Sequence, residues 1–168
     1  MKALDIAMTQ EELQAAVWEL SQRTAIEELQ ADYWWYMDTK QWDKWRDVFT
    51  DDFAYYQYGQ LVTEGGDAFV AYNQKQLPPF VTAHQGHQHK IVFTSKTTAT
   101  GRWILNDYLT TTQTKDAYIG YGYYLNDYEK CSDGKWRIKV QRLGYFRFET
   151  TQGPNLFEQV AYQTPASE

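Results

Sequence analysis

The chain has 168 residues, the usual length of one domain, and carries 16 Lys and Arg against 22 Asp and Glu. Its net charge of −6 argues against a surface for nucleic acid or an anionic membrane. The single cysteine, Cys131, excludes an intramolecular disulfide and a thiolate metal cluster. We therefore expect one cytoplasmic domain over residues 1–168, with a core at about 9–150, a C-terminal tail at 151–168, and no nucleic-acid or membrane partner.

Aromatic residues dominate the apolar content, because the chain contains 14 Tyr and seven Trp. A core built from these rings carries hydroxyl and indole groups inside the protein. Each such group needs a hydrogen-bond partner or a ligand once it is buried. The composition thus predicts an aromatic interior with polar groups at the ring tips.

The first predicted elements are helices. Thr9 with Glu12 and Thr24 with Glu27 both have the spacing of a capping box, in which each side chain satisfies the backbone amide of the other residue. Apolar residues follow both pairs at helical spacing. These patterns predict two consecutive helices, beginning at about Thr9 and Thr24.

Further elements of the N-terminal half are short. We expect a third helix over residues 41–48 and a fourth from residue 65 to residue 71, which ends before Pro78. A pair of short strands is expected at 53–58 and 60–63.

The second half is rich in Thr, Tyr, Ile and Trp, which is typical of strands. Asp133-Gly134 predicts a hairpin turn, because this pair tolerates a positive φ. Internal glycines at 101, 120, 122 and 144 predict bulges or bends in long strands. The expected strands are residues 88–93, 97–112, 117–129 and 135–149. Helices followed by a long curled antiparallel sheet predict an α+β fold, with the helices in the concave side and an open mouth where a small ligand can bind.

Three histidines, His84, His87 and His89, occur within six residues and are the only ones in the chain. No acidic or cysteine residue lies nearby in sequence and the spacing matches no zinc-binding helix, so we expect no metal. His87 and His89 are also consistent with structural histidines that precede a strand. For His84 we favour a general base, because an imidazole titrates near neutral pH.

Asp107 is a carboxylate within an apolar strand pattern. Strand alternation places it on one face with three apolar residues: Trp103, Leu105 and Leu109. A carboxylate there is costly unless it is paired or lines a wet cavity. The alternative to a functional role is a buried salt bridge, for which three arginines are available: Arg102, Arg142 and Arg147.

Tyr33 and Asp38 lie near the end of the second predicted helix. Tyr33 shares the apolar stripe of Ile26 and Leu29, so its hydroxyl is expected to point inward. On a regular helix Asp38 would lie about 140° from Tyr33. If both face one pocket, the helix must end or distort there; taken by itself, Asp38 fits a capping or turn residue better than a functional one. Arg147 alone is consistent with an edge charge.

Taken together, the chain resembles the SnoaL-like group of the nuclear-transport-factor-two-like superfamily from about Glu11 to Phe148. The likeness is strongest to bile acid 7α-dehydratases and more distant to scytalone dehydratase. It rests on these stretches: residues 33–38, Trp42-Asp43, His84-Gln85-Gly86-His87, Thr97-Thr98-Ala99-Thr100-Gly101-Arg102-Trp103, Asp107, Tyr128-Glu129-Lys130, Gly144-Tyr145 and Arg147.

The resemblance implies a cone-shaped α+β barrel with five catalytic positions at the pocket: Tyr33, Asp38, His84, Asp107 and Arg147. It further implies cofactor-free elimination of a hydroxyl, in which His84 removes a proton and Asp38 orients the imidazole. Tyr33 would donate to the oxygen that gains negative charge, while Asp107 and Arg147 would assist departure of the hydroxyl. The expected substrate is a small hydrophobic or aromatic compound that contacts a further set of side chains: Trp34, Tyr55, His87, Trp103 and Tyr145.

Three other functions fit the same resemblance. One is a lyase that acts on lignin-derived diarylpropanes and releases formaldehyde through a quinone methide. Another is a cofactor-free isomerase or cyclase, and the last is a non-catalytic binding or assembly module. The resemblance also implies a homo-oligomer, either a trimer or a dimer.

Overall fold

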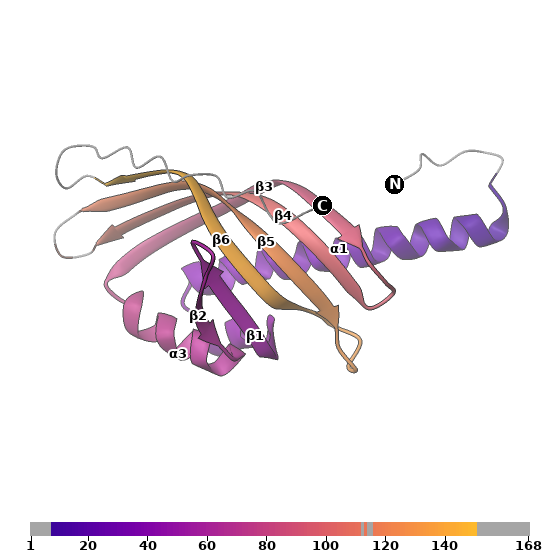
Figure 1. The fold of residues 1–168 in the computed structure, drawn as a ribbon, viewed down its shortest axis with the longest axis horizontal. Coiled ribbons are helices and arrows are strands. Elements are labelled where there is room, and N and C mark those ends of the chain that lie inside the picture. Colours follow the sequence, from indigo (N-terminus) through magenta and orange to yellow (C-terminus); the bar gives the residue numbers. More distant parts are fainter. Residues whose placement is uncertain (1–7, 112, 114–115, 151–168) are drawn as a thin grey trace.

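The computed structural model describes residues 8–111, 113 and 116–150 of the chain. The tail predicted at 151–168 lies outside these residues. Three helices and six strands form the fold, with the N-terminal helix and α3 beside a single sheet (Figure 1). In chain order the elements are α1 (Gln10–Asp38), α2 (Trp42–Arg46), β1 (Phe49–Gln57), β2 (Gln60–Glu64), α3 (Gly66–Gln76), β3 (Phe80–Phe93), β4 (Thr98–Thr111), β5 (Ala117–Lys130) and β6 (Trp136–Thr150).

Helix α1 is one continuous helix rather than the two predicted. The capping box of Thr9 and Glu12 is confirmed and begins the helix. Thr24, by contrast, lies inside the helix, because no glycine or proline interrupts the chain between the two capping boxes. Within the described ranges, no helix combines the length and apolar character that crossing a bilayer requires.

The strand that contains the histidines is longer than predicted. β3 begins at Phe80, not at residue 88, and pairs with β4 along most of its length. An irregularity between His87 and Lys90, with Gln88 at φ 50°, interrupts the pairing. Polar and glycine residues obscured this strand in the sequence, because their β-propensity is low and pairing with β4 overrides it. As a consequence, His84 has a defined strand neighbour.

The sheet has the strand order β2-β1-β6-β5-β4-β3, so β2 and β3 are its edges. It is curved and unclosed, and the long strands arch over α1 (Figure 1). The expected α+β cone is confirmed, with one correction: β1 pairs with β6 in parallel, so the sheet is mixed rather than wholly antiparallel. The hairpin at Gly134 (φ 81°) is as predicted. Gly122 borders a register shift in the pairing of β5 with β6.

Polar ring tips inside the core are paired with one another, as the composition predicts. Tyr128 Oη receives a hydrogen bond from Trp103 Nε1 at 2.7 Å and donates to Gln30 Oε1 at 2.9 Å. Asn126 Nδ2 donates to the same Gln30 oxygen. Two buried indole N–H groups, of Trp34 and Trp45, lack a partner among the described residues. The core is therefore a polar-tipped aromatic layer between α1 and the sheet.

This core predicts an alkaline limit to stability. Burial raises the pKa of five tyrosines above the ordinary value: Tyr33, Tyr55, Tyr124, Tyr128 and Tyr145. The folded state thus favours the neutral phenol. Its contribution to stability is complete below about pH 10 and is lost as the pH rises toward the folded-state values. In an ultraviolet absorbance titration, these tyrosines should ionise only together with loss of circular dichroism. Ionisation of all 14 tyrosines near pH 10 with unchanged dichroism would contradict the prediction.

Candidate active site

The end of α1 meets edge strand β3 through one carboxylate. Asp38 Oδ1 lies 2.6 Å from His84 Nδ1, and Asp38 Oδ2 accepts the backbone N–H of His84 at 2.8 Å. The His84 side chain is only 7% exposed and that of Asp38 is 21% exposed. Because an ionised carboxylate can only accept, Nδ1 must carry the ring proton in this pair. The other ring nitrogen, Nε2, is then left with its lone pair and can accept a proton.

Two residues that the sequence analysis missed extend this pair. Thr82 Oγ1 donates to Asp38 Oδ1 at 2.8 Å, and Lys40 Nζ donates to Thr82 Oγ1 at 2.7 Å. Thr82 and His84 lie two positions apart on β3, so strand alternation presents both to the same side. Lys40 is half-buried, and desolvation lowers its pKa while Asp38 opposes that shift.

Asp107 is the strand partner of His84, because the two residues face each other across β3 and β4. It is 4% exposed, and it lies on the inner face with Trp103 and Leu105, as alternation predicts. Its Oδ2 accepts the Tyr145 hydroxyl at 2.5 Å, and none of the ion pairs among the described residues includes it. The partner of Asp107 is therefore a tyrosine, not one of the arginines that the salt-bridge alternative offered.

The second oxygen of Asp107 is buried without a hydrogen-bond partner among the described residues. Gly120 of β5 faces it, and a methyl group at that position would lie 1.9 Å from Oδ1. The glycine is needed for this close approach rather than for a bulge. This unpartnered oxygen therefore lies toward β5, whereas His84 lies on β3 at the other side of β4.

Tyr33 lies in the core, 2% exposed, as its place on the apolar stripe predicts. Its hydroxyl donates to Gln141 Oε1 of β6 at 3.0 Å. Its ring packs against Trp34 and Tyr124. Tyr33 therefore enters the interior from the same helix as Asp38, with its proton engaged by Gln141.

Arg147 does not join the cluster. Its side chain is 51% exposed, forms an ion pair with Glu149, and lies over the Tyr121 ring at 5.9 Å from the centroid. The cause is the register shift in β6, where Tyr145 pairs with Gly122 and Arg147 with Tyr121. This extra residue turns Arg147 to the face of Tyr121 and brings Phe148 beside Tyr145 on the inner face.

The predicted substrate-contacting residues divide in a similar way. Trp34, Tyr55, Trp103 and Tyr145 are buried on the inside. The Trp34 ring packs against Gly86 of β3, and only a glycine allows this approach, since a methyl group there would lie 1.6 Å from the indole. His87 is exposed and pairs with Ile104, away from this interior. His89, which was not assigned to substrate, stacks on Trp103 and lies 2.9 Å from Glu27.

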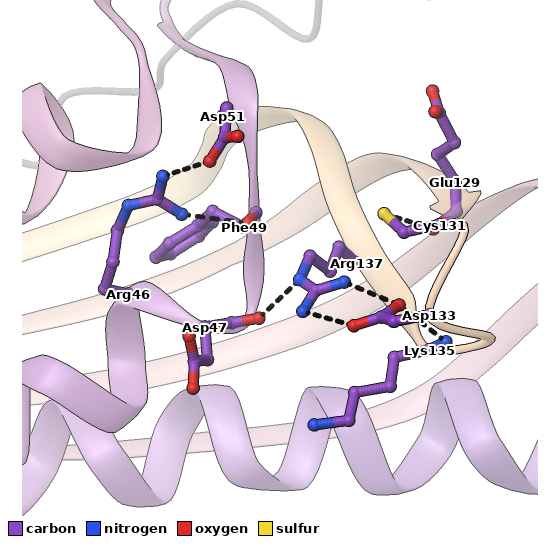
Figure 2. A network of polar contacts seen from close by, with 9 residues as sticks. All are labelled: Arg46, Asp47, Phe49, Asp51, Glu129, Cys131, Asp133, Lys135 and Arg137. Atoms are coloured by element: carbon purple, nitrogen blue, oxygen red, sulfur yellow. Dashed lines mark hydrogen bonds and ion pairs between the residues drawn. The ribbon is translucent and has the colours of Figure 1, made fainter.

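A groove of about 650 Å³ lies at the other end of the sheet, and none of the predicted site residues lines it. Measured along β4, the separation from Thr98 at that end to Asp107 is about 30 Å by the usual strand rise. Two arginines occupy the groove with acidic partners: Arg46 binds Asp67 and Asp51, and Arg137 binds Asp133 through two hydrogen bonds. Figure 2 shows the bond of Arg46 to Asp51 and both bonds of Arg137 to Asp133. The Arg137 bonds lower the pKa of Asp133 to about 2. These ion pairs neutralise both arginines that line the groove.

Metal ligands do not gather in the part of the chain that the structure describes, where no three His, Cys, Asp or Glu residues could hold a metal ion. The candidate residues come from the end of α1 and from β3, β4 and β6.

The sequence model of the SnoaL-like domain matches residues 18–142. The chain belongs to the SnoaL-like family. The fold of this SnoaL-like domain is shared with a protein from Novosphingobium aromaticivorans that is assigned by name to the scytalone dehydratases, at 21% identity and a TM-score of 0.77. That comparison covers 89% of this chain and 99% of the other.

Two other solved structures are similar. LinA-type3, a hexachlorocyclohexane dehydrochlorinase from Novosphingobium barchaimii, has 18% identity and a TM-score of 0.72, with coverage of 84% of this chain and 97% of that chain. Rv3472, a protein of unknown function from Mycobacterium tuberculosis, has 25% identity and a TM-score of 0.66, with coverage of 84% and 78%. The SnoaL-like chain therefore shares its architecture with proteins of differing names.

The bond between Tyr145 and Asp107 gives a testable prediction for this SnoaL-like domain. Tyr145→Phe leaves a buried carboxylate with both oxygens unpartnered, so we expect the free energy of unfolding to fall by about 1–3 kcal/mol. Tyr121→Phe is the matched control, because Tyr121 is an exposed tyrosine of the same sheet, and it should change stability by less than about 0.5 kcal/mol. Urea denaturation measures both; equal stabilities for the two variants would show that the bond contributes nothing.

Proposed function

We propose that this SnoaL-like domain is a cofactor-free lyase of the dehydratase type, in which His84 is the acid–base catalyst. The observation that carries the proposal is the pair of hydrogen bonds that Asp38 accepts from His84, one from the backbone N–H and one from Nδ1. It fixes the ring in one orientation and presents Nε2 as a base. A carboxylate in contact with Nδ1 also stabilises the imidazolium that forms when Nε2 takes a proton.

The similar structures support an elimination. A dehydratase removes water and a dehydrochlorinase removes hydrogen chloride, and proteins with each name share this fold. Both eliminations need a base for a carbon-bound proton and a site for the departing group. In this proposal His84 supplies the first and, as the imidazolium, the proton for a departing hydroxyl, and Asp107, its strand partner, contacts the substrate hydroxyl.

The proposed reaction removes a proton and a hydroxyl group from neighbouring carbons. His84 Nε2 takes the proton, the electron pair of the C–H bond forms the new double bond, and the C–O bond breaks. The imidazolium then returns the proton to the departing hydroxyl, so that water leaves and His84 is neutral again. A single base that serves first as base and then as acid suits departure of both groups from one face.

Neighbouring side chains have supporting roles in this proposal. Asp107, held by Tyr145, accepts a hydrogen bond from the substrate hydroxyl. Tyr33 can donate to an oxygen of the substrate when it exchanges Gln141 for that oxygen. Arg147 is left out of the mechanism because of its place on the opposite face.

The substrate class that fits is a hydrophobic polycyclic or aromatic alcohol. Trp34, Trp103 and Tyr145 are rings of the interior next to the proposed catalytic groups. Flat rings pack well against such side chains by edge and stacking contacts. A hydroxysteroid and a lignin-derived diarylpropanediol both meet this description, and a carbonyl or phenol conjugated to the reacting carbons would make the proton acidic.

The product mass tests the reaction type. Purified protein is incubated without cofactor with hydroxysteroids and with diarylpropanediols that carry a conjugated carbonyl or phenol. Loss of water alone supports the dehydratase; loss of water plus formaldehyde identifies the diarylpropane lyase instead. An isomer of unchanged mass identifies an isomerase or cyclase. No change in any compound, together with binding, identifies a binding module and overturns the proposal.

Variants of the pair test the roles of His84 and Asp38. His84→Gln removes the base, and Asp38→Asn presents an amide that no longer selects the Nδ1–H form, so each should lower kcat by about 100-fold or more. His89→Gln and Glu27→Gln are matched controls, because they break a second histidine–carboxylate pair between β3 and α1. We expect these two controls to retain wild-type kcat within a few-fold. Full turnover by His84→Gln would refute the assignment.

A further inference from the structure

A line of four groups leads from solvent to the proposed base. Lys40 Nζ donates to Thr82 Oγ1 at 2.7 Å, Thr82 Oγ1 donates to Asp38 Oδ1 at 2.8 Å, and Asp38 Oδ1 lies 2.6 Å from His84 Nδ1. The direction of every bond is fixed by chemistry. An ammonium group can only donate and a carboxylate can only accept, so the Thr82 hydroxyl must point its hydrogen at Asp38.

Lys40 stands where helices ordinarily have glycine. Helix α1 ends in a Schellman motif, in which Lys40 N–H bonds to Met37 O and Gln41 N–H to Tyr36 O. The residue that follows the cap takes a left-handed conformation, and Lys40 has φ 58°. Glycine adopts this conformation without steric cost, whereas a lysine does not.

Asp38 is also unfavourable by local criteria. It is the last residue of α1, where the helix dipole disfavours a negative charge, and no basic residue lies in the last turn. Lys40, one residue beyond the cap, supplies the positive charge. Two residues that oppose the local preferences of the backbone therefore meet through Thr82, and strained or disfavoured residues of this kind concentrate at functional sites.

We propose that Lys40 is a positioning residue which, through Thr82, orients the Asp38 carboxylate and keeps the His84 ring neutral at lower pH than an isolated aspartate–histidine pair would allow. Nothing in the family resemblance or the sequence pattern pointed to Lys40 or Thr82. The catalytic consequence rests on the proposed function, whereas the effect on His84 does not.

The charges around His84 determine the direction in which loss of the Lys40 charge shifts the protonation of the ring. Asp38 of α1 is bonded to the ring, and Asp107 of β4 is the strand partner of His84, with Tyr145 of β6 bonded to Asp107. Lys40, after α1, reaches Asp38 through Thr82, and Tyr33 of α1 interacts electrostatically with Asp38 and Asp107. Asp38 and Asp107 favour the imidazolium, and Lys40 is the cation of this group that opposes it. Removal of the Lys40 charge should therefore raise the pH at which His84 becomes protonated.

Nuclear magnetic resonance titration of the histidine rings tests the proposal without a substrate. Lys40→Met should move the His84 midpoint to higher pH by about 0.5–1 unit, while Lys40→Arg leaves it unchanged. Thr82→Val should move it in the same direction, because Asp38 loses a donor, and Thr82→Ser should restore it. His87 and His89 are internal references in the same spectra and should not move.

Measuring thermal stability together with the His84 midpoint distinguishes a positioning role of Lys40 from an effect on folding. Lys40→Gly removes the charge and relieves the positive φ, so it should raise Tm and still shift the His84 midpoint as Lys40→Met does. Gln88→Gly relieves the same kind of backbone conformation on β3 (φ 50°) and should leave the His84 midpoint unchanged. A His84 midpoint that stays within about 0.2 pH units in Lys40→Met and Lys40→Gly would overturn the proposal.

Kinetics with a compound that the enzyme converts then tests the consequence for catalysis. The acid limb of the kcat/KM profile of Lys40→Met should move upward by the same amount as the His84 midpoint. A shifted midpoint without turnover of any compound would refute the lyase and leave the role of Lys40 standing. Turnover without a shifted midpoint would refute the role of Lys40 and leave the lyase standing.

Discussion

A single carboxylate joins the end of helix α1 to the edge of the sheet, and the arrangement of the site depends on it. Asp38 accepts a backbone N–H and a ring nitrogen from the same residue, His84, so it fixes both the strand and the side chain. The backbone bond also occupies an N–H group of edge strand β3, which would otherwise be available to another strand. Because α1 carries Tyr33 and Trp34 one turn earlier, the same contact sets where these rings enter the core.

The rest of the interior follows from the use of tyrosine and tryptophan in place of aliphatic residues. A tyrosine brings a donor into the core, and the chain meets this requirement with partners such as Gln30, Gln141 and Asp107. The Asp107–Tyr145 bond differs from the others because its acceptor is a carboxylate, of which the second oxygen is buried without a partner among the described residues. Several buried polar atoms of the core thus lack a partner among the described residues, including Trp34 Nε1, Gln141 Nε2 and Asp107 Oδ1.

Local patterns of the sequence predicted part of this arrangement and could not predict the rest. Alternation correctly placed Asp107 inside, because a strand has a fixed period of two. Arg147, for which the resemblance implied a pocket position and the residue pattern alone an edge charge, lies on the outer face, since a register shift in β6 adds a residue before it. The capping box at Thr9 began a helix as predicted, but the one at Thr24 did not, since the same four residues can also lie within a helix.

The groups that were missed act only through tertiary contacts. Lys40 and Thr82 are 42 positions apart and carry no motif; a lysine at the glycine-preferring position after a helix was the one signal available. The position of Lys40 can be recognised as one that prefers glycine only once the end of α1 is known. The sequence thus placed His84, Asp38 and Asp107 among the candidates, while the pairing of β3 with β4 and the end of α1 determined how they meet.

The tautomer of the neutral His84 ring is the most direct test of the proposed role of the Asp38–His84 pair. Nitrogen chemical shifts of the imidazole in the neutral protein distinguish a ring protonated at Nδ1 from one protonated at Nε2. The account predicts the proton at Nδ1, held by Asp38, with a free lone pair at Nε2, and it predicts that Asp38→Asn abolishes this preference. A neutral ring protonated at Nε2 in the unaltered protein would have no base to offer, and it would contradict the proposed role of the Asp38–His84 pair.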